Sequence, residues 1–409
     1  MDHQAREAAP DSATRRLVTG AGAVTLGSLL ANVAAYLLHL PASRWLGPEG
    51  YGAFAALLSA QLLVAVPSLA LQAVVARELV RGTPSGALRS LGARVAALVA
   101  VIAALAVVPV SLALDTPVLA TAAALAPGPV LCLLATEQGL LQGAERFRAL
   151  GAVLALAGAG KVVPAVAVLA AGGGVGPALA AGAVGVALAW AGAAWIRAAG
   201  AGAGSGPAAA GAGTLTSPGV AAVLAAGQVQ LVMMALTSVD LLLARALLSP
   251  EDAGRYALGA VAAKAAFWLP QAVGTVLYPR MADPAGHRGA VRFAVRVLLG
   301  IGALVVVAAA VAGPLVPAVV GEDYRPVAGV LWAFAALGVT LSVLQALLLA
   351  AIASGRTAEA AIAWCGLALT GVAVWAAPRE LAAVLGATLV VVVLTTLVAG
   401  WRALRPRPA

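Results

Sequence analysis

Charged residues are scarce in this chain of 409 residues. Only 10% of them are Asp, Glu, Lys or Arg, whereas 62% are hydrophobic and the mean hydropathy is +1.01. A soluble domain carries about 25% charged residues, because its surface is solvated by water. The low content excludes a water-soluble fold, and several apolar runs reach the roughly 20 residues that cross a hydrocarbon core. The sequence therefore predicts a polytopic membrane protein.

Cysteine and histidine are also rare, and the common catalytic motifs are missing. Cys132 and Cys365 lie inside apolar runs, which favours small packing residues over a disulfide or a metal site. The three histidines form no zinc pattern, and the patterns GxxxxGKS, GxxxxGKT, HExxH and GxSxG do not occur. We therefore expect a protein that is not an enzyme, with no catalytic residue, no metal and no cofactor.

Apolar runs predict twelve helical spans, because open strand edges cannot be satisfied in hydrocarbon. The run at 17–40 is too long for the core of a signal peptide, so we interpret it as a retained first span. Kinks or broken turns are predicted at Pro67, Pro127, Pro129, Pro164 and Pro270. The spans are 17–40, 51–76, 91–114, 118–143, 150–171, 177–198, 217–244, 253–278, 292–315, 326–353, 358–377 and 380–402.

The placement of arginine and lysine predicts the orientation of these spans. A formal charge of +9 would suggest nucleic acid as a partner of a soluble protein, but here the basic residues alternate from one connection to the next. Eighteen lie on the side of both termini, five on the other side, and two inside spans. Cytoplasmic connections carry the excess of positive charge. We expect cytoplasmic N- and C-termini and no nucleic-acid partner.

A stretch rich in Gly, Ala and Ser, residues 199–216, interrupts the apolar pattern near the middle of the chain. This composition is typical of a flexible tether without a core of its own. It predicts a cytoplasmic linker between an N-terminal six-helix bundle, residues 1–198, and a C-terminal six-helix bundle, residues 217–409.

A short polar passage occurs twice, once in each half. The stretch RWLGPEGYGAF begins at Arg44, and RALLSPEDAGRYAL begins at Arg245. Aligned in this register, Pro48-Glu49 matches Pro250-Glu251, Tyr51 matches Tyr256 across a short insertion, Pro67 matches Pro270 and Arg77 matches Arg280. We interpret the match as an internal duplication.

The duplication predicts the symmetry of the fold. Six spans per copy is an even number, so both copies enter the membrane from the same side. Parallel repeats of this kind are related by a pseudo-two-fold axis along the membrane normal. The expected fold is all-α, with two six-helix bundles enclosing a cavity that opens to alternate faces. The repeated passages would be extracytoplasmic turns.

Two lysines fall near the middles of predicted spans. Lys161 lies in the fifth span and Lys264 in the eighth, where lysine costs about 2.5–3.5 kcal/mol on insertion scales. Such residues mark a wet pathway, although snorkelling or pairing with a carboxylate on another helix is the alternative interpretation. In the repeat register Lys264 falls opposite Gln61. Arg94 and Arg296, near span ends, are further candidate cations.

Two acidic residues are candidates for ion coupling. Asp240, near the outer end of the seventh span, aligns with His39, and Glu137 lies in the inner part of the fourth span. A carboxylate in low-dielectric surroundings can carry a proton. The alternatives are ion pairs, of Asp240 with Arg245 and of Glu137 with Arg146 or Arg148. The walls of the cavity are predicted on the first and seventh spans, which carry Ser28, Asn32, Tyr36, Gln228, Gln230, Thr237 and Ser238.

Three stretches resemble polysaccharide-biosynthesis flippases of the Wzx type. They are LGPEGYGAF, LLQGAERFRALG from Leu140 to Gly151, and the passage from Ser238 to Met281. The resemblance implies membership of the superfamily that also holds lipid II flippases and multidrug extruders. It implies a multi-pass protein of the bacterial cytoplasmic membrane that moves a polyprenyl-diphosphate-linked oligosaccharide to the outer leaflet. A glycan polymerase and glycosyltransferases are the implied protein partners, besides membrane lipids.

The physical chemistry of the candidate residues agrees with this resemblance. A diphosphate head group requires cations in the cavity, and Lys161, Lys264, Arg94 and Arg296 would supply them. A cation-coupled exporter of small molecules with the same architecture is the second hypothesis, which carboxylates in the cavity would favour. A membrane glycosyltransferase or glycan polymerase would need an acidic pair on a large outer loop, which the sequence lacks. Lipid II flippases look to have fourteen spans, two more than predicted here.

Overall fold

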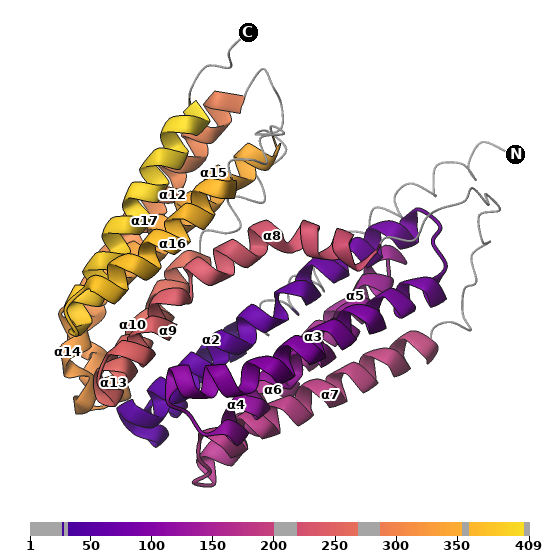
Figure 1. Ribbon diagram of the computed structural model, residues 1–409, viewed down its shortest axis with the longest axis horizontal. Helices are drawn as coiled ribbons and strands as arrows, with labels where there is room; N and C mark the ends of the chain where they lie inside the picture. Colours follow the sequence, from indigo (N-terminus) through magenta and orange to yellow (C-terminus); the bar gives the residue numbers. More distant parts are fainter. Residues whose placement is uncertain (1–26, 28–31, 200–218, 269–286, 354–359, 405–409) are drawn as a thin grey trace, which may run out of the picture. The chain divides into compact units, whose positions relative to one another are not determined.

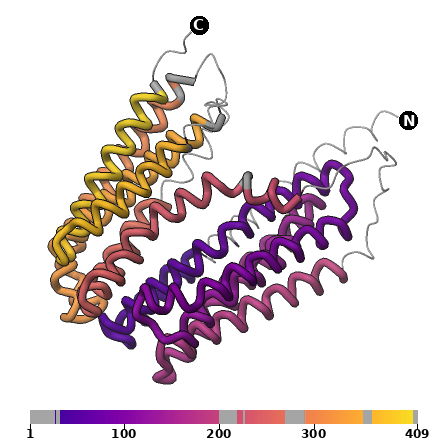
Figure 2. The backbone as a smooth tube through the Cα atoms, viewed as in Figure 1, coloured from indigo at the N-terminus to yellow at the C-terminus, as the bar shows by residue number. Residues whose placement is uncertain are grey.

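A computed structural model describes residue 27 and residues 32–199, 219–268, 287–353 and 360–404. Every element within these ranges is a helix (Figure 1, Figure 2). Eight of the described helices are long and apolar enough to cross a membrane, and a bent pair makes nine. The predicted all-α, polytopic fold is confirmed. The total of twelve spans includes stretches, such as most of 17–40, that lie outside the described residues.

The described parts of the predicted spans are mostly helical, with breaks inside some of them. Helix also runs through the predicted connection between the first two spans, 41–50, and is interrupted there only at Gly47. In chain order the elements are α2 (His39–Val80), α3 (Ser85–Leu114), α4 (Val118–Leu125), α5 (Pro127–Gly143), α6 (Phe147–Ala170), α7 (Val175–Ala199), α8 (Val220–Leu236), α9 (Val239–Leu247), α10 (Pro250–Trp268), α12 (His287–Ala312), η2 (Gly313–Leu315), α13 (Val316–Val320), η3 (Glu322–Tyr324), α14 (Arg325–Ala328), α15 (Leu331–Ala353), α16 (Ala360–Ala376) and α17 (Leu381–Leu404).

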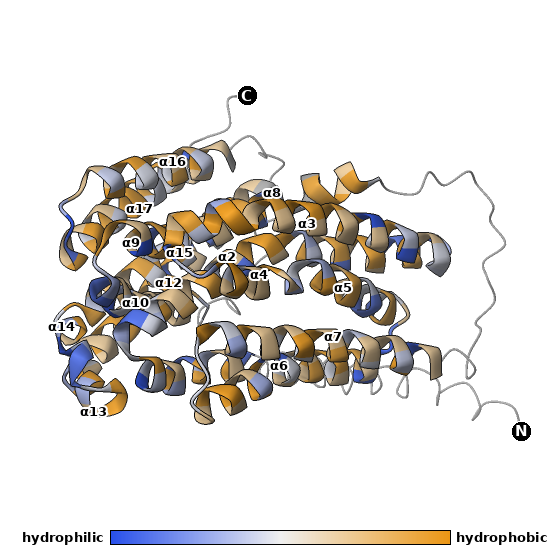
Figure 3. Ribbon diagram, turned by 60° about the horizontal axis from the view of Figure 1, so that its bottom comes forward, coloured by the Kyte–Doolittle hydropathy of each residue, from blue (hydrophilic) through white to orange (hydrophobic). Residues whose placement is uncertain are grey.

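The surface of the helices is apolar, as a lipid-facing surface must be. Hydrophobic residues extend along the helices, and hydrophilic residues gather near several helix ends (Figure 3). A water-soluble protein rarely exposes apolar patches of this extent. The side chains that are more than 70% exposed include Leu105, Leu112, Leu119, Trp195, Leu304 and Val311.

The chain forms two compact units. The first unit contains the described residues of Met1–Leu38, Val64–Ser111 and Pro117–Gln228, and the second contains those of His39–Leu63, Leu112–Thr116 and Val229–Ala409. Two segments from the first half of the sequence therefore belong to the same unit as the second half. Apart from Ala199, the last residue of α7, the predicted linker at 199–216 lies outside the described residues, so the division into bundles at that point stays a prediction.

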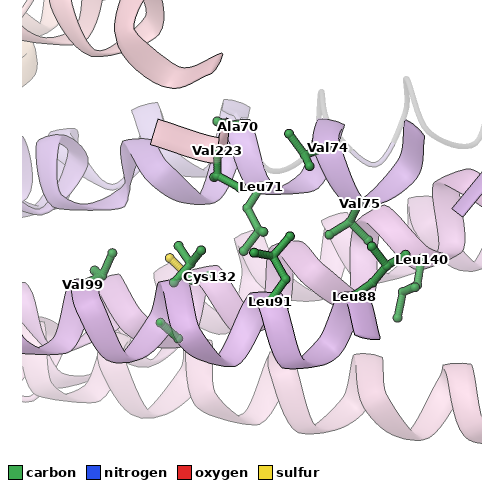
Figure 4. Close-up of a cluster of buried hydrophobic side chains, with 12 residues drawn as sticks. Ala70, Leu71, Val74, Val75, Leu88, Leu91, Val99, Cys132, Leu140 and Val223 are labelled. Atoms are coloured by element: carbon green, nitrogen blue, oxygen red, sulfur yellow. The ribbon is translucent and has the colours of Figure 1, made fainter. Parts of the chain in front are cut away.

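The first unit has its largest described core between α2, α3 and α5. Side chains one helical turn apart on α2, such as Leu71 and Val75, pack against Leu88 and Leu91 of α3 (Figure 4). Cys132 of α5 is buried in the same cluster with a free thiol, which confirms its prediction as a packing residue. Cys365, on α16 of the second unit, is also a free thiol.

Glycines set the distance between α6 and α7 in the first unit. A Cβ atom built on Gly185 would overlap the carbonyl oxygen of Gly160, and one built on Gly160 would lie 2.7 Å from the carbonyl oxygen of Gly185. The two backbones therefore touch. Helices in lipid associate by this close packing across small residues, because burying apolar area gains little there.

The second unit is built around α10, α15 and α17. Ala266 of α10 packs with Ala335 and Val339 of α15, in a cluster that α12 borders through Val305 and Val306. The small residues on α10 again allow close approach: a Cβ on Gly338 of α15 would overlap the carbonyl oxygen of Ala263. This packing holds α10, which carries Lys264, firmly in the unit.

The two copies of the repeated passage form the same kind of turn. In the first copy Gly47 breaks α2 with φ 64° and ψ 176°, and helix resumes at Pro48. In the second copy α9 ends at Leu247, and α10 begins at Pro250. Proline fits the first turn of a helix, where its missing N–H is not needed, and glycine adopts positive φ without strain. Both copies thus break the helix just before a proline, at positive φ in Gly47 and at extended backbone in Leu248, and the extracytoplasmic position of the two turns stays a prediction.

Further helix breaks divide predicted spans, and the tenth span is divided between α14 and α15. The fourth span is interrupted at Ala126, before Pro127 and Pro129, as the sequence predicts. The seventh span bends by 41° between α8 and α9, where no proline occurs. Pro67 and Pro164 lie inside helices that continue past them, and Pro270 lies outside the described residues.

Candidate functional site

Lys161 is an intramembrane cation without a counter-charge in the described part of the chain. It is half-buried on α6, where the facing residue of α7 is Gly182. No carboxylate lies within ion-pair distance of its ammonium group among the described residues, and none of their polar atoms accepts a hydrogen bond from it. The pairing that would have explained this lysine as a structural residue is therefore not found there.

Lys264 is held in the second unit by a hydroxyl group. Its Nζ donates a hydrogen bond of 2.8 Å to Oγ of Ser59 on α2, and Ser59 in turn donates to the carbonyl oxygen of Ala55. Gln61, two residues after Ser59, is also buried, and the repeat register places it opposite Lys264. Its Oε1 has no hydrogen-bond partner among the described residues. A buried amide oxygen without a partner is costly, so it marks a polar position inside the unit.

Asp240 lies at the first turn of α9 and is buried. Its Oδ2 accepts a hydrogen bond of 2.9 Å from the hydroxyl group of Tyr256 on α10. Its Oδ1 has no partner among the described residues, and neither has Oγ of the neighbouring Ser238. The charges of Asp240 and Lys264 interact, although the two groups are too far apart for an ion pair. The expected alternative, a pair with Arg245, does not form, because Arg245 donates to the carbonyl oxygens of Leu114 and Asp115.

His39 makes the hydrogen bond in the first copy that Asp240 makes in the second. Nδ1 of His39 lies 3.0 Å from the hydroxyl group of Tyr51, and the two rings meet edge to face. The aligned residues, His39 with Asp240 and Tyr51 with Tyr256, thus form equivalent pairs. Both tyrosines are fully buried. The register proposed from the sequence is confirmed at this point of the structure.

Glu137 has a strong partner of its own. It forms an ion pair with Arg197 of α7, inside the first unit. Arg146, one of the two partners expected from the sequence, donates instead to the carbonyl oxygens of Ile196 and Arg197 at 3.1 and 3.2 Å. Together these contacts fasten the start of α6 and the end of α5 to the last turn of α7. Gln142 adds a bond to Gln72 of α2.

The remaining candidate residues lie apart from these clusters. Arg94 is exposed on α3 and donates only to the carbonyl oxygen of Ser90, at 3.4 Å, and Arg296 is exposed on α12. Asn32 and Gln228 are exposed, and Gln230 is half-buried on α8. Ser28 lies outside the described residues. Arg94 and Lys161 belong to the first unit, whereas Arg296 and Lys264 belong to the second.

Sequence reasoning missed two residues of the buried polar group around Lys264 and Asp240. Ser59 was not singled out, because a serine in an apolar span bonds its own helix as a rule, and it does so here as well. Tyr256 was used as a landmark of the repeat, yet it is fully buried and bonds Asp240. The alignment of Tyr256 with Tyr51 and of Asp240 with His39 was the signal that these residues belong together.

The fold is similar to that of solved membrane transporters. A multidrug resistance MATE family transporter of the MOP superfamily, in an inward-facing conformation, matches with a TM-score of 0.67 and 13% identity over 90% of this chain and 93% of its own. Lipid II flippase MurJ, in an inward closed conformation, matches with a TM-score of 0.69 and 10% identity over 94% and 87%. The Vibrio cholerae MATE transporter VcmN in the bent form matches with a TM-score of 0.56 and 16% identity over 96% and 98%.

No protein-family model and no curated protein sequence matches the chain. Likeness at identities of 10–16% shows the fold. MATE transporters and MurJ belong to the superfamily that the resemblance implied, and the Wzx type stays a prediction. The chain is a multi-pass membrane protein with the fold that MATE transporters and the lipid II flippase MurJ share.

Proposed function

We propose that the protein is a flippase that moves a polyprenyl-diphosphate-linked oligosaccharide from the cytoplasmic to the outer leaflet. It would act by alternating access, as a multi-pass protein of the bacterial cytoplasmic membrane with both termini in the cytoplasm. The fold supports a transporter, because structures with this fold include a multidrug transporter and a lipid II flippase. Our choice between these two kinds of substrate rests on the charge of the intramembrane residues.

The observation that carries the proposal is the uncompensated cation Lys161. A lysine inside a span costs about 2.5–3.5 kcal/mol on insertion scales, and the described residues offer this one no counter-charge. A diphosphate head group would supply that counter-charge. A cationic drug would be repelled. The charge therefore favours an anionic lipid as substrate.

Lys264 supports the same conclusion from the second unit. Its hydrogen bond to Ser59 is one that a phosphate oxygen can replace without leaving a carboxylate unpaired. The lipid chain carries no charge, so the lysines would act on the diphosphate. The proposal gives Arg94 and Arg296 the supporting role of attracting the head group, because both are exposed.

Substitution of the two lysines tests the proposal. Purified Lys161→Met and Lys264→Met variants keep the length of the side chain without its charge, and Lys161→Arg and Lys264→Arg keep the charge. We expect each Met variant to lose at least tenfold in translocation of a fluorescent polyprenyl-diphosphate oligosaccharide in liposomes, and each Arg variant to lose less. Translocation at the wild-type rate by both Met variants would refute the assigned role of the lysines.

A second candidate function is the export of small molecules coupled to a cation. The buried carboxylate of Asp240 favours it, because Oδ1 has no partner among the described residues. Asp240→Asn keeps the acceptor for Tyr256 and removes the charge, so it separates coupling from folding. Efflux of a cationic dye that follows an imposed proton gradient, and that stops in Asp240→Asn, would establish the exporter. If the dye were retained at every imposed proton gradient, the exporter hypothesis would be excluded.

The proposed substrate also defines the partners. A flippase for lipid-linked glycans receives its substrate from glycosyltransferases on the cytoplasmic face and delivers it to a glycan polymerase on the outer face. Co-purification of the protein with such a polymerase would support this place in the reaction sequence.

A further inference from the structure

The two arginines of the repeated passage reach across the second unit in a reciprocal manner. Arg44, in the first copy, donates from Nη2 to the carbonyl oxygen of Ala318 at 3.0 Å, on the short helix α13 that directly follows the ninth predicted span. Arg245, in the second copy, donates to the carbonyl oxygens of Leu114 and Asp115 at 2.9 and 3.1 Å, at the end of the third span.

This exchange follows the symmetry of the repeat. The third and ninth spans occupy the same position in the two six-span copies, so each arginine binds at the end of the other copy's third span. A two-fold interface has this property, because residue i contacts residue j and j contacts i. All of these residues belong to the second compact unit. The reciprocal contacts therefore join the outer end of one copy to the outer end of the other.

Glycines bring the backbones together at the same joint. A Cβ atom on Gly254 of the second copy would overlap the carbonyl oxygen of Pro48, and one on Gly52 would lie 2.9 Å from the backbone nitrogen of Gly254. The part of α2 that resumes at Pro48 and the start of α10 therefore cross with their backbones in contact. Each copy supplies one of the two glycines that this crossing requires.

Two tyrosines and a strained residue complete the joint. Tyr324 donates to the carbonyl oxygen of Ser43 at 3.2 Å and packs edge to face on Tyr51. Burial, with a smaller effect from the charge of Asp323, raises the pKa of the Tyr324 hydroxyl, so it stays a donor. Asp115 has φ 47°, in the left-handed region that favours glycine, and Arg245 binds its carbonyl oxygen. Such a conformation persists only where its surroundings hold it.

We propose that this joint is a gate that closes one end of the transport pathway, with Arg44 and Arg245 as its two latches. The outer position of the gate rests on the orientation in the proposed function. Both latches bind carbonyl oxygens at helix ends, which water can satisfy as well. Opening the gate leaves no carboxylate unpaired, so the joint is suited to break and re-form in every cycle.

Accessibility of a buried thiol tests the latches without any substrate. The reporter is Ala253→Cys in a chain that lacks both native cysteines, because Ala253 is fully buried beside Gly254. The full-length protein in sealed vesicles is treated with a membrane-impermeant thiol reagent. We expect Arg44→Ala, which loses one charge-assisted hydrogen bond, to raise the labelling rate by about tenfold, and Arg245→Ala, which loses two, to raise it at least as much. The double variant should be labelled faster than either single variant, since both latches hold one gate.

The matched control is Arg379→Ala, which removes an exposed arginine from the same predicted face, away from the joint. If the double variant does not fold, Arg44→Lys with Arg245→Lys takes its place, because lysine keeps the charge but lacks the rigid planar fork with which Arg245 binds two carbonyl oxygens.

Labelling rates in all latch variants equal to that of Arg379→Ala would overturn the proposal. Faster labelling in inverted vesicles alone would keep the gate and refute the proposed orientation. Faster labelling from outside, in a protein that moves no lipid-linked glycan, would refute only the substrate.

Discussion

The charged residues of the membrane spans differ in whether a partner is present, and this difference decides their roles. Glu137 is paired with Arg197, Lys264 is bound to a serine, and Lys161 has no partner among the described residues. The sequence predicts that such residues are costly and therefore significant. It cannot predict the partner, because the partner depends on how two helices are rotated and shifted against each other. Arg245, expected to bind Asp240 five residues away, binds the end of α3 instead.

The ion pair between Glu137 and Arg197 predicts a stability effect rather than a transport effect. The Glu137 side chain is 7% exposed and that of Arg197 24% exposed. Removing one partner of a buried pair leaves the other charge uncompensated, which costs about 3 kcal/mol. We expect Glu137→Gln to lower the free energy of unfolding by roughly 2–3 kcal/mol, measured by thermal unfolding in detergent.

The control is Glu322→Gln, which breaks the pair between Glu322 and Arg325 on the surface. Those two side chains are 76% and 79% exposed, so the loss should stay below about 1 kcal/mol. Equal losses in the free energy of unfolding would show that the pair of Glu137 with Arg197 stabilises the protein no more than an exposed pair does. If Glu137→Gln instead lost ion-dependent transport and kept its stability, Glu137 would act in ion coupling.

Helices are the scale at which the sequence was most informative. The length of the apolar runs predicts the spans, because the thickness of the bilayer fixes how many residues cross it. Pro127 and Pro129 predict the break before α5, and Gly47 and Pro48 predict the first repeated turn. The bend between α8 and α9 was not predicted. At that bend Thr237 donates its hydroxyl to the carbonyl oxygen of Met234, a local bond that competes with the regular helix.

The crossing of α6 and α7 predicts that Gly185 is needed for the close packing of these two helices. A Cβ on Gly185 would overlap the carbonyl oxygen of Gly160, so Gly185→Ala must push the helices apart. We expect Gly185→Ala to lower the free energy of unfolding by about 1–3 kcal/mol, the range for overpacking, and to be detected by thermal unfolding. Because α6 carries Lys161, transport should fall as well.

Gly371→Ala is the matched control on α16. A Cβ there would meet nothing within 4 Å, so only helix propensity changes, and alanine is favoured over glycine by up to about 1 kcal/mol. The control should be neutral or slightly stabilising. If Gly185→Ala behaved like Gly371→Ala, close backbone packing would not hold α6 against α7.

The whole molecule combines two copies of one sequence pattern. Matching turns, the matching pairs of His39 with Tyr51 and Asp240 with Tyr256, and the reciprocal contacts of Arg44 and Arg245 all follow the same register. That register could be derived from the sequence, because few polar landmarks interrupt the apolar spans. The membership of residues 39–63 and 112–116 in the second compact unit could not, because it depends on which helix ends pack together in a given conformation.

The central claim is that an anionic lipid head group is the substrate of a transporter in which Lys161 is an intramembrane cation without a counter-charge among the described residues. Reconstitution of the purified protein in liposomes tests it most directly, with two fluorescent polyprenyl oligosaccharides that differ only in the presence of the diphosphate. We predict that the diphosphate lipid becomes accessible to an impermeant quencher on the far leaflet only when the protein is present, and that the neutral lipid does not. Equal translocation of both lipids, or movement of neither, would contradict the account.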